Sequence, residues 1–276
     1  MSALPNYTRE SISIPQRLLR EGKLHLIPLY ALLRTSDLAR EGIESSGSFR
    51  FADHIYQGRA RGRYGIGWVL DGILLRLRAA RSMRNRYRHS RDMIVAEASR
   101  ASGAEFKVLS VPCGIARELS EAAAILRAEM PSVYGRIRFF GLDIDGEPLA
   151  LSRELVRDHP NFSFSLGNAL DASAYPNDLD VIVSTGLGDF LDDASLVRFY
   201  RICHQALRPG GVLVTSAQQP QPLADFLMRE LAELRATYRD PRQLEEALRS
   251  SGFTDVSVRR DPVGLQALAV ARRSAA

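Results

Sequence analysis

From residue 106 onward, short apolar runs alternate with longer segments of helical pattern. Six of these runs have the length of strands, and they cover residues 106–111, 140–143, 161–166, 179–184, 254–260 and 265–272. Each of the first four is followed by turn residues or by a helix-forming segment. The alternation predicts an α/β fold, in which helices cover both faces of a mostly parallel sheet.

The first hundred residues predict helices. We expect a helical region over residues 18–40 with an interruption at Pro28, a polar linker over 44–49, a short helix over 50–57 and a glycine-rich loop over 58–67. Apolar residues at helical spacing then predict one amphipathic helix over residues 67–88, with a basic face. The chain would divide into a helical N-terminal extension, residues 1–100, and an α/β domain, residues 101–276.

The end of the first predicted strand is the most informative stretch. The strand breaks at Pro112 and Gly114, and a helix-forming run over residues 116–127 follows at once. In such a strand–turn–helix unit, the free N–H groups at the start of the helix face a bound ligand. The second strand ends at Asp143, where a carboxylate accepts hydrogen bonds from ribose hydroxyls in dinucleotide-type sites. Asp145, not Asp143, is the better cap for the next helix.

The next two strand ends extend this pattern. Gly167-Asn168-Ala169 follows the third strand, and the fourth leads into Thr185-Gly186 and then Asp189. Asn168 suits either a contact with an adenine edge or the closing of a turn. The phosphate-binding pattern G-x-G-x-x-G is missing, so a ligand with ribose and no pyrophosphate is favoured.

Taken together, residues 105–273 resemble a class I S-adenosylmethionine-dependent methyltransferase domain. Ser110 to Ala116 stands where that family has an acidic residue followed by G-x-G-x-G, and Leu207-Arg208-Pro209-Gly210-Gly211 is similar to the corner before its fifth strand. The resemblance implies a Rossmann-like, seven-stranded, mostly parallel sheet that a final antiparallel hairpin closes. It also implies S-adenosylmethionine as the cofactor.

The resemblance assigns roles to individual residues. The expected cofactor-binding positions are Ser110, Pro112, Cys113, Gly114, Asp143, Ile144, Asn168, Ala169, Thr185 and Gly186. Arg88, on the helix that leads to the first strand, is expected to pair with the methionine carboxylate of the cofactor. Tyr87 and Asp189 are the candidate catalytic residues. Because serine replaces the family's acidic residue at Ser110, a partner for the cofactor's ammonium group is lost.

Three functions are compatible with these residues. The first is methyl transfer to a small-molecule or lipid-like acceptor, which needs positioning and desolvation more than a general base. The second is a lyase or cyclase that uses the aminobutyrate arm of S-adenosylmethionine and releases methylthioadenosine, as azetidine-2-carboxylate synthases do. The third is a non-catalytic ligand-binding scaffold. In the enzymatic interpretations, the N-terminal extension would form a lid.

Composition and charge refine this picture. The net charge is +5, and eleven arginines lie between residues 48 and 91 against Asp53 and Asp71. This segment is compatible with a solvated basic helix face, or with a surface that binds anionic lipid or an anionic substrate. Binding of nucleic acid is the least favoured interpretation. Cys113 and Cys203 suggest neither a disulfide framework nor a metal site. The N-terminal residues 1–7 lack the pattern of a signal peptide, and we expect a cytoplasmic protein whose oligomeric state the sequence leaves open.

Overall fold

The computed structural model describes residues 12–44 and 48–275, and the chain divides into two compact units. A helical unit comprises residues 1–84 and 220–236, and a sheet unit comprises residues 85–219 and 237–276. The first division falls inside helix α6 (Arg78–Arg100), whereas the sequence predicts it at the end of that helix. The N-terminal residues 1–7 and most of the predicted linker over 44–49 lie outside the described residues.

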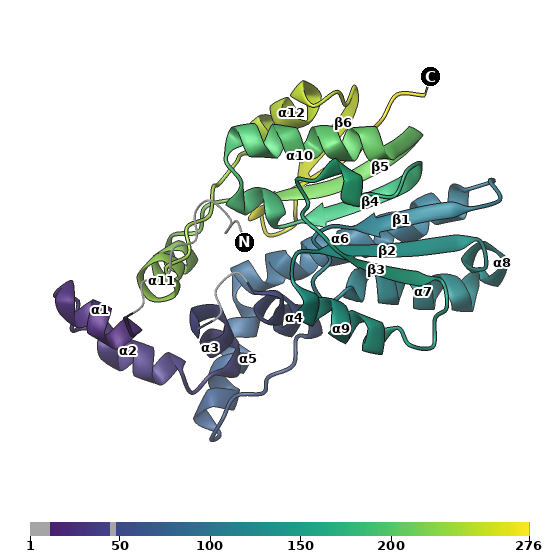
Figure 1. Ribbon diagram of the computed structural model, residues 1–276. Coiled ribbons are helices and arrows are strands. Elements are labelled where there is room, and N and C mark those ends of the chain that lie inside the picture. Colours follow the sequence, from purple (N-terminus) through teal and green to yellow (C-terminus); the bar gives the residue numbers. More distant parts are fainter. Residues whose placement is uncertain (1–11, 45–47, 276) are drawn as a thin grey trace. The chain divides into compact units, whose positions relative to one another are not determined.

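The sheet unit is built on one seven-stranded sheet, in the order β3-β2-β1-β4-β5-β7-β6 (Figure 1). Strand β7 runs antiparallel to both of its neighbours, and the other pairings are parallel. The strands are β1 (Phe106–Ser110), β2 (Ile137–Asp143), β3 (Phe162–Leu166), β4 (Leu179–Thr185), β5 (Leu207–Gln218), β6 (Asp255–Arg260) and β7 (Gln266–Arg272). This topology confirms the Rossmann-like sheet and the closing antiparallel hairpin.

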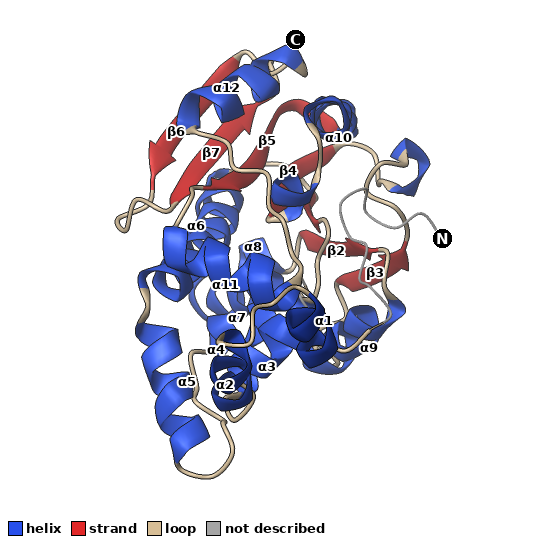
Figure 2. Ribbon diagram, turned by 90° about the vertical axis from the view of Figure 1, so that its left-hand side faces the viewer, coloured by secondary structure: helices blue, strands red, loops and turns tan. Residues whose placement is uncertain are grey.

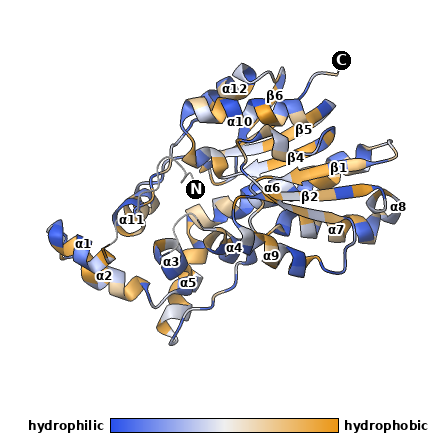
Figure 3. Cartoon of the chain, viewed as in Figure 1, coloured by the Kyte–Doolittle hydropathy of each residue, from blue (hydrophilic) through white to orange (hydrophobic). Residues whose placement is uncertain are grey.

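Helices cover both faces of this sheet because successive residues of its buried strands point to opposite sides. On one face, Val108 of β1 packs in a core with residues of α6 and α7. On the other face, Leu109 packs with residues of α10 and α12. The helices of this unit after α6 are α7 (Arg117–Glu129), α8 (Pro131–Tyr134), α9 (Gly146–Leu155), α10 (Asp193–Ala206) and α12 (Pro241–Ser250), with 3-10 turns at Ala172–Ala174 and Leu187–Phe190. In Figure 3, hydrophobic residues (orange) are prominent along the central strands β1, β4 and β5.

The helical unit contains two apolar clusters and draws one helix from a distant part of the sequence (Figure 2). Besides the start of α6, its helices are α1 (Ile14–Arg20), α2 (Leu26–Leu33), α3 (Asp37–Glu44), α4 (Phe49–Gln57), α5 (Ile66–Arg76) and α11 (Pro222–Ala232). Leu231 of α11 is buried with Leu18 and Leu33. Arg17 also forms an ion pair with Glu233 at 2.7 Å, just after α11.

Two expectations for this unit need correction. The single helix predicted over residues 67–88 is wrong, because Leu77 has an extended ψ of 151° and separates α5 from α6. Pro28 does not interrupt a helix either. It lies in the first turn of α2, where its missing N–H costs no helical hydrogen bond. None of the described helices is both long and apolar enough to cross a membrane.

Candidate cofactor-binding site

The carboxyl ends of β1, β2 and β4 meet at one edge of the sheet, since these strands are parallel neighbours. The loop after β1 is tied to β2 by its backbone. The Cys113 N–H donates to the Leu142 carbonyl at 3.0 Å, and the Gly114 N–H donates to Oδ2 of Asp143 at 2.8 Å. Ser152 of α9 holds the same loop, because its hydroxyl lies 3.1 Å from both the Gly114 carbonyl and the Ala116 N–H. The predicted loop residues therefore lie together beside Asp143, with Pro112 directly before Cys113.

Asp143 is a buried carboxylate at the end of β2, with 7% of its surface exposed. It also accepts the Asp145 N–H at 3.0 Å. Burial raises the pKa of Asp143, while the hydrogen bonds from the backbone N–H groups of Asp145 and Gly114 oppose that rise. Asp145 caps α9 through the Glu147 N–H, as predicted. Asp143 therefore does not cap α9. Its carboxylate lies at the end of β2, next to Ile144, whose apolar side chain is exposed.

A second carboxylate lies at the end of β1, and the sequence analysis missed it. The hydroxyl of Ser110 donates to Oε1 of Glu118 at 2.6 Å, and both side chains are buried. Glu118 belongs to the first turn of α7, next to the loop. Burial raises the pKa of Glu118, and the hydrogen bond from Ser110 lowers it. The expected loss of an acid at Ser110 is therefore corrected, since α7 supplies a carboxylate to the same strand end.

A buried arginine faces the end of β4. The guanidinium of Arg86, on α6, packs against Gly186, where an added Cβ would lie 3.2 Å from Nη2. Gly186 has a φ of 102°, which strongly favours glycine and permits this close approach. Nη1 of Arg86 lies 3.7 Å from Oδ2 of Asp189. Arg86 is thus a buried cation at this strand end, whereas Arg88 is exposed and lies about 200° further round the helix. The pairing of Arg88 with the cofactor carboxylate stays a prediction.

Asp189, one of the two candidate catalytic residues, forms hydrogen bonds to two other parts of the chain. Its Oδ1 accepts the Gln218 N–H at 2.9 Å, and its backbone carbonyl accepts the Thr237 N–H at 2.7 Å. Burial raises the pKa of Asp189 to about 6, although Arg86, the Gln218 N–H and Arg239 favour the charged form. Asp189 has 3% of its surface exposed and its carboxylate lies beside Arg86, and its catalytic role stays a prediction.

Tyr87, the other candidate, is turned toward α7. Burial raises its pKa, and a hydrogen bond with Glu121 and the charge of Glu118 add to the rise. The raised pKa favours the protonated phenol at neutral pH, and the catalytic role of Tyr87 stays a prediction. His89 is no better, because burial and Arg259 lower its pKa to about 4. The thiol of Cys113 is also neutral, since burial raises its pKa.

The third strand end is more exposed than the other two. Oδ1 of Asn168 accepts the Leu170 N–H at 2.9 Å, which closes a turn, so a contact with adenine would use its NH₂ group. The carbonyl of Ala169 accepts the Tyr175 hydroxyl at 2.7 Å. Thr185 is half-buried at the end of β4. These contacts fix the backbone around the candidate site and leave the predicted adenine contact a prediction.

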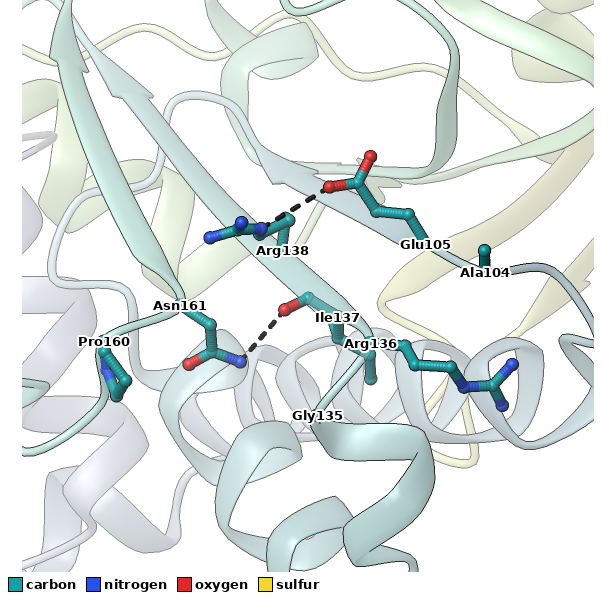
Figure 4. A pocket seen from close by; sticks show the side chains of 8 residues that line it. All are labelled: Ala104, Glu105, Gly135, Arg136, Ile137, Arg138, Pro160 and Asn161. Carbon is teal, nitrogen blue, oxygen red and sulfur yellow. Dashed lines mark hydrogen bonds and ion pairs between the residues drawn. The ribbon is translucent and has the colours of Figure 1, made fainter.

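The hollow shown in Figure 4, with a volume of about 350 Å³, lies elsewhere. Its lining residues include Glu105, Ile137 and Asn161, which stand at or next to the first residues of β1, β2 and β3. It is therefore at the opposite edge of the sheet from Asp143. A 3.4 Å ion pair between Arg138 and Glu105 crosses it. Among the described residues, no cluster of three or more His, Cys, Asp or Glu side chains could hold a metal ion.

Comparison with known proteins relates most of the chain to one family. A family model described as "Putative methyltransferase" matches residues 29–273. Among curated protein sequences, none matches the chain.

Solved structures add similarities of fold. A protein of Bordetella parapertussis, described as a possible exported protein, is 25% identical, and the similarity covers 95% of this chain and 93% of that one with a TM-score of 0.77. Magnesium protoporphyrin IX methyltransferase of Synechocystis PCC 6803, solved with bound SAH, is 12% identical over 85% of this chain and 97% of its own, with a TM-score of 0.56. The S-adenosylmethionine-dependent methyltransferase SibL is 17% identical over 95% and 78%, with a TM-score of 0.54.

Proposed function

The chain belongs to the methyltransferase family that matches residues 29–273, and from this premise we propose that it binds S-adenosylmethionine at the ends of β1, β2 and β4 and methylates a small-molecule or lipid-like acceptor. One observation carries the proposal. The Asp143 carboxylate is buried at the end of β2 and accepts the Gly114 N–H of the loop that leads into α7. The Gly114 and Asp145 N–H groups do not use all the lone pairs of this carboxylate, so its oxygens can also accept hydrogen bonds from ribose hydroxyls.

Two charged groups support the binding of the amino-acid end of the cofactor. That end is a zwitterion, so its site needs an anion for the ammonium group and a cation for the carboxylate. Glu118 with Ser110 supplies the anion, and Arg86 supplies the cation. Both groups lie near α6, because the charge of Glu118 acts on the phenol of Tyr87 and the adjacent Arg86 faces Gly186. Charge-assisted hydrogen bonds of this kind are the strong ones.

The residues suit a reaction that depends on positioning. In methyl transfer, an acceptor lone pair forms a bond to the methyl carbon, while the methyl–sulfur bond breaks and its electron pair returns to sulfur. Asp143, Glu118 and Arg86 would orient the cofactor for that displacement. Tyr87 and Cys113 keep their protons at neutral pH and offer no base. An acceptor that is already ionised, or has a free lone pair, needs none.

Calorimetry with S-adenosylhomocysteine tests the proposed site. Asp143→Ala should weaken binding by about 1.5–3 kcal/mol, the range for a hydrogen bond to a charged group. Asp145→Ala is the matched control, because it removes the same charge two residues away and affects the cap of α9. Its affinity should equal that of the wild type. Equal affinities for wild type and Asp143→Ala would remove Asp143 from the site.

Product analysis separates methyl transfer from the alternatives. The protein is incubated with S-adenosylmethionine alone, and then with the cofactor and a cell extract. Formation of S-adenosylhomocysteine only in the presence of extract is the expected result. Methylthioadenosine formed without any acceptor would overturn methyl transfer in favour of chemistry on the aminobutyrate arm. Tight cofactor binding with no product in either mixture would point to a scaffold.

A further inference from the structure

Helix α5 of the helical unit carries an exposed apolar face that the proposed function does not use. Ile66, Val69 and Ile73 have 65%, 53% and 51% of their surface exposed, and Leu77 directly after the helix has 39%. At about 100° per residue, Ile66, Val69 and Ile73 lie within an arc of about 60°. Large aliphatic side chains gathered in this way on a surface mark a site of interaction.

The opposite side of α5 is the one that packs. Gly67, Asp71 and Leu75 are buried, and they lie about 180° from the exposed face. Two exposed aromatic residues lie at the N-terminal end of α5, namely Trp68 with 59% of its surface exposed, about 100° round the helix from Val69, and Tyr64 with 86%, which precedes the helix. We call the aliphatic residues Ile66, Val69, Ile73 and Leu77, together with Tyr64 and Trp68 at their N-terminal end, the α5 face. Helix α5 is thus amphipathic, and its buried side packs within the helical unit.

The segment of the chain that carries the α5 face is strongly basic. Six exposed arginines precede or follow the helix, namely Arg59, Arg61, Arg63, Arg76, Arg78 and Arg81. Asp71 is the single acidic residue between residues 54 and 91. Its side chain is fully buried and accepts hydrogen bonds from the N–H groups of Arg61 and Gly62, each at 2.8 Å. No exposed carboxylate in this segment therefore offsets the arginines.

We propose that the α5 face docks onto the surface of an anionic lipid bilayer. Aliphatic residues, interfacial aromatic residues and a basic border are the combination that an acidic membrane surface binds. Trp and Tyr favour the level of the lipid headgroups, because their rings are apolar and their N–H or O–H groups are polar. A second copy of the chain on this face would bring six arginines against six arginines, and like charges at an interface oppose such an association.

The single tryptophan of the chain, Trp68, is exposed in the first turn of α5, within the segment proposed to dock, so its fluorescence reports docking. The unmodified protein is titrated with vesicles of phosphatidylcholine alone and with vesicles that also contain phosphatidylglycerol. With the anionic vesicles at low salt, the Trp68 emission should shift to the blue, and brominated lipid should quench it. Raising the salt to 0.5 M should reverse both effects, because it screens the arginines. Vesicles without anionic lipid should leave the emission unchanged.

Variants identify the surface. The triple change Arg76→Gln, Arg78→Gln and Arg81→Gln should weaken vesicle binding by about a hundredfold, since each basic residue near an anionic leaflet contributes roughly fivefold. The control, Arg157→Gln, Arg242→Gln and Arg249→Gln, removes the same charge from exposed residues of the sheet unit and should bind as the wild type does. Ile66→Ser with Ile73→Ser should also weaken binding.

Three outcomes would overturn the proposal. The first is an unshifted Trp68 emission with anionic vesicles at low salt, and the second is an equal loss of binding in both arginine triples. The third is a dimer in sedimentation that Ile66→Ser with Ile73→Ser dissociates, which would assign the α5 face to a second copy of the chain.

Discussion

Glu118 and Ser110 place a buried carboxylate at the end of β1, with 9% of the Glu118 surface exposed. Such a group is costly to ionise in isolation, and burial raises its pKa accordingly. A bound ammonium group would supply the missing counter-charge, so ligand and carboxylate would stabilise each other. Glu118 would then contribute more to the affinity for a zwitterionic ligand than for the same nucleoside without its amino-acid arm.

Comparing two ligands tests this contribution. Glu118→Gln should weaken S-adenosylhomocysteine binding by about 2 kcal/mol and leave 5′-methylthioadenosine, which lacks the ammonium group, unchanged. Glu121→Gln, an exposed residue one turn along α7, is the control and should affect neither ligand. Calorimetry with both ligands gives the difference directly. An equal loss for the two ligands would show that Glu118 acts on the fold of the loop.

Arg86 and Arg88 form a second matched pair, because they differ by two residues on α6 and face opposite sides. Arg86→Gln should weaken S-adenosylhomocysteine binding by about 2 kcal/mol, since Arg86 is buried beside Gly186 and would meet the ligand carboxylate. Arg88→Gln should bind as the wild type does. Calorimetric titration of both variants checks the assignment, which fails if Arg88→Gln shows the larger loss.

Asp189 predicts a pH dependence of stability. Its pKa of about 6 in the folded protein exceeds the usual value of 3.8, so the folded state holds this proton more tightly than the unfolded chain does. Its contribution therefore falls as pH rises from about 4 to 6, by on the order of 2 kcal/mol. Thermal unfolding of wild type and Asp189→Asn across this range should show wild type losing stability relative to the variant. A constant difference between the two would contradict the raised pKa.

At the scale of elements, two glycines of α5 should respond oppositely to the same substitution. A Cβ at Gly67 would lie 1.9 Å from the Thr35 carbonyl oxygen, so Gly67→Ala must displace backbone within the helical unit. A Cβ at Gly72 meets nothing within 4 Å. We expect Gly67→Ala to lower stability by about 2 kcal/mol or more, and Gly72→Ala to raise it by up to about 1 kcal/mol. Denaturant unfolding measures both, and a stabilised Gly67→Ala would contradict the packing of α5 on Thr35.

The sequence predicts the sheet unit well because its buried strands are short, apolar and punctuated by turn residues. It fails at Leu77, since apolar spacing continues on both sides of the break and only the backbone turn at that residue separates α5 from α6. The sequence also carries a signal for Arg86 as a buried arginine of α6. Arg86 stands four residues before Ser90 and eight before Ile94, and this spacing places it on the buried side of α6.

Glu118 was missed for another reason. Family motifs are compared position by position, whereas the carboxylate here comes from a different element and reaches the same strand end. No one-dimensional pattern gives that proximity. The sequence nevertheless contains a signal for Glu118. An acidic residue in the first helical turn after the loop lies close in space to the end of the preceding strand.

At the scale of the whole molecule, each of the two units is formed by two separate segments of the chain. Removing residues 1–84 alone should leave α11 without the partners of Leu231, so the truncated chain should aggregate or bind a hydrophobic dye. Replacing residues 220–236 with a short Gly-Ser linker as well should give a folded, monomeric sheet unit. Circular dichroism and size-exclusion chromatography compare the two chains. A soluble first truncation with no dye binding would show that α11 needs no partners.

The short linker is justified by Asp189, which bonds the chain on both sides of this segment, at Gln218 through its side chain and at Thr237 through its backbone carbonyl. The chain therefore leaves and re-enters the sheet unit beside the same residue. A segment inserted at such a place can change in length without moving the strands on either side, so insertions there are tolerated. Relatives of this protein could therefore carry a different segment in place of residues 220–236. Such a replacement would have to preserve Asp189, and not α11.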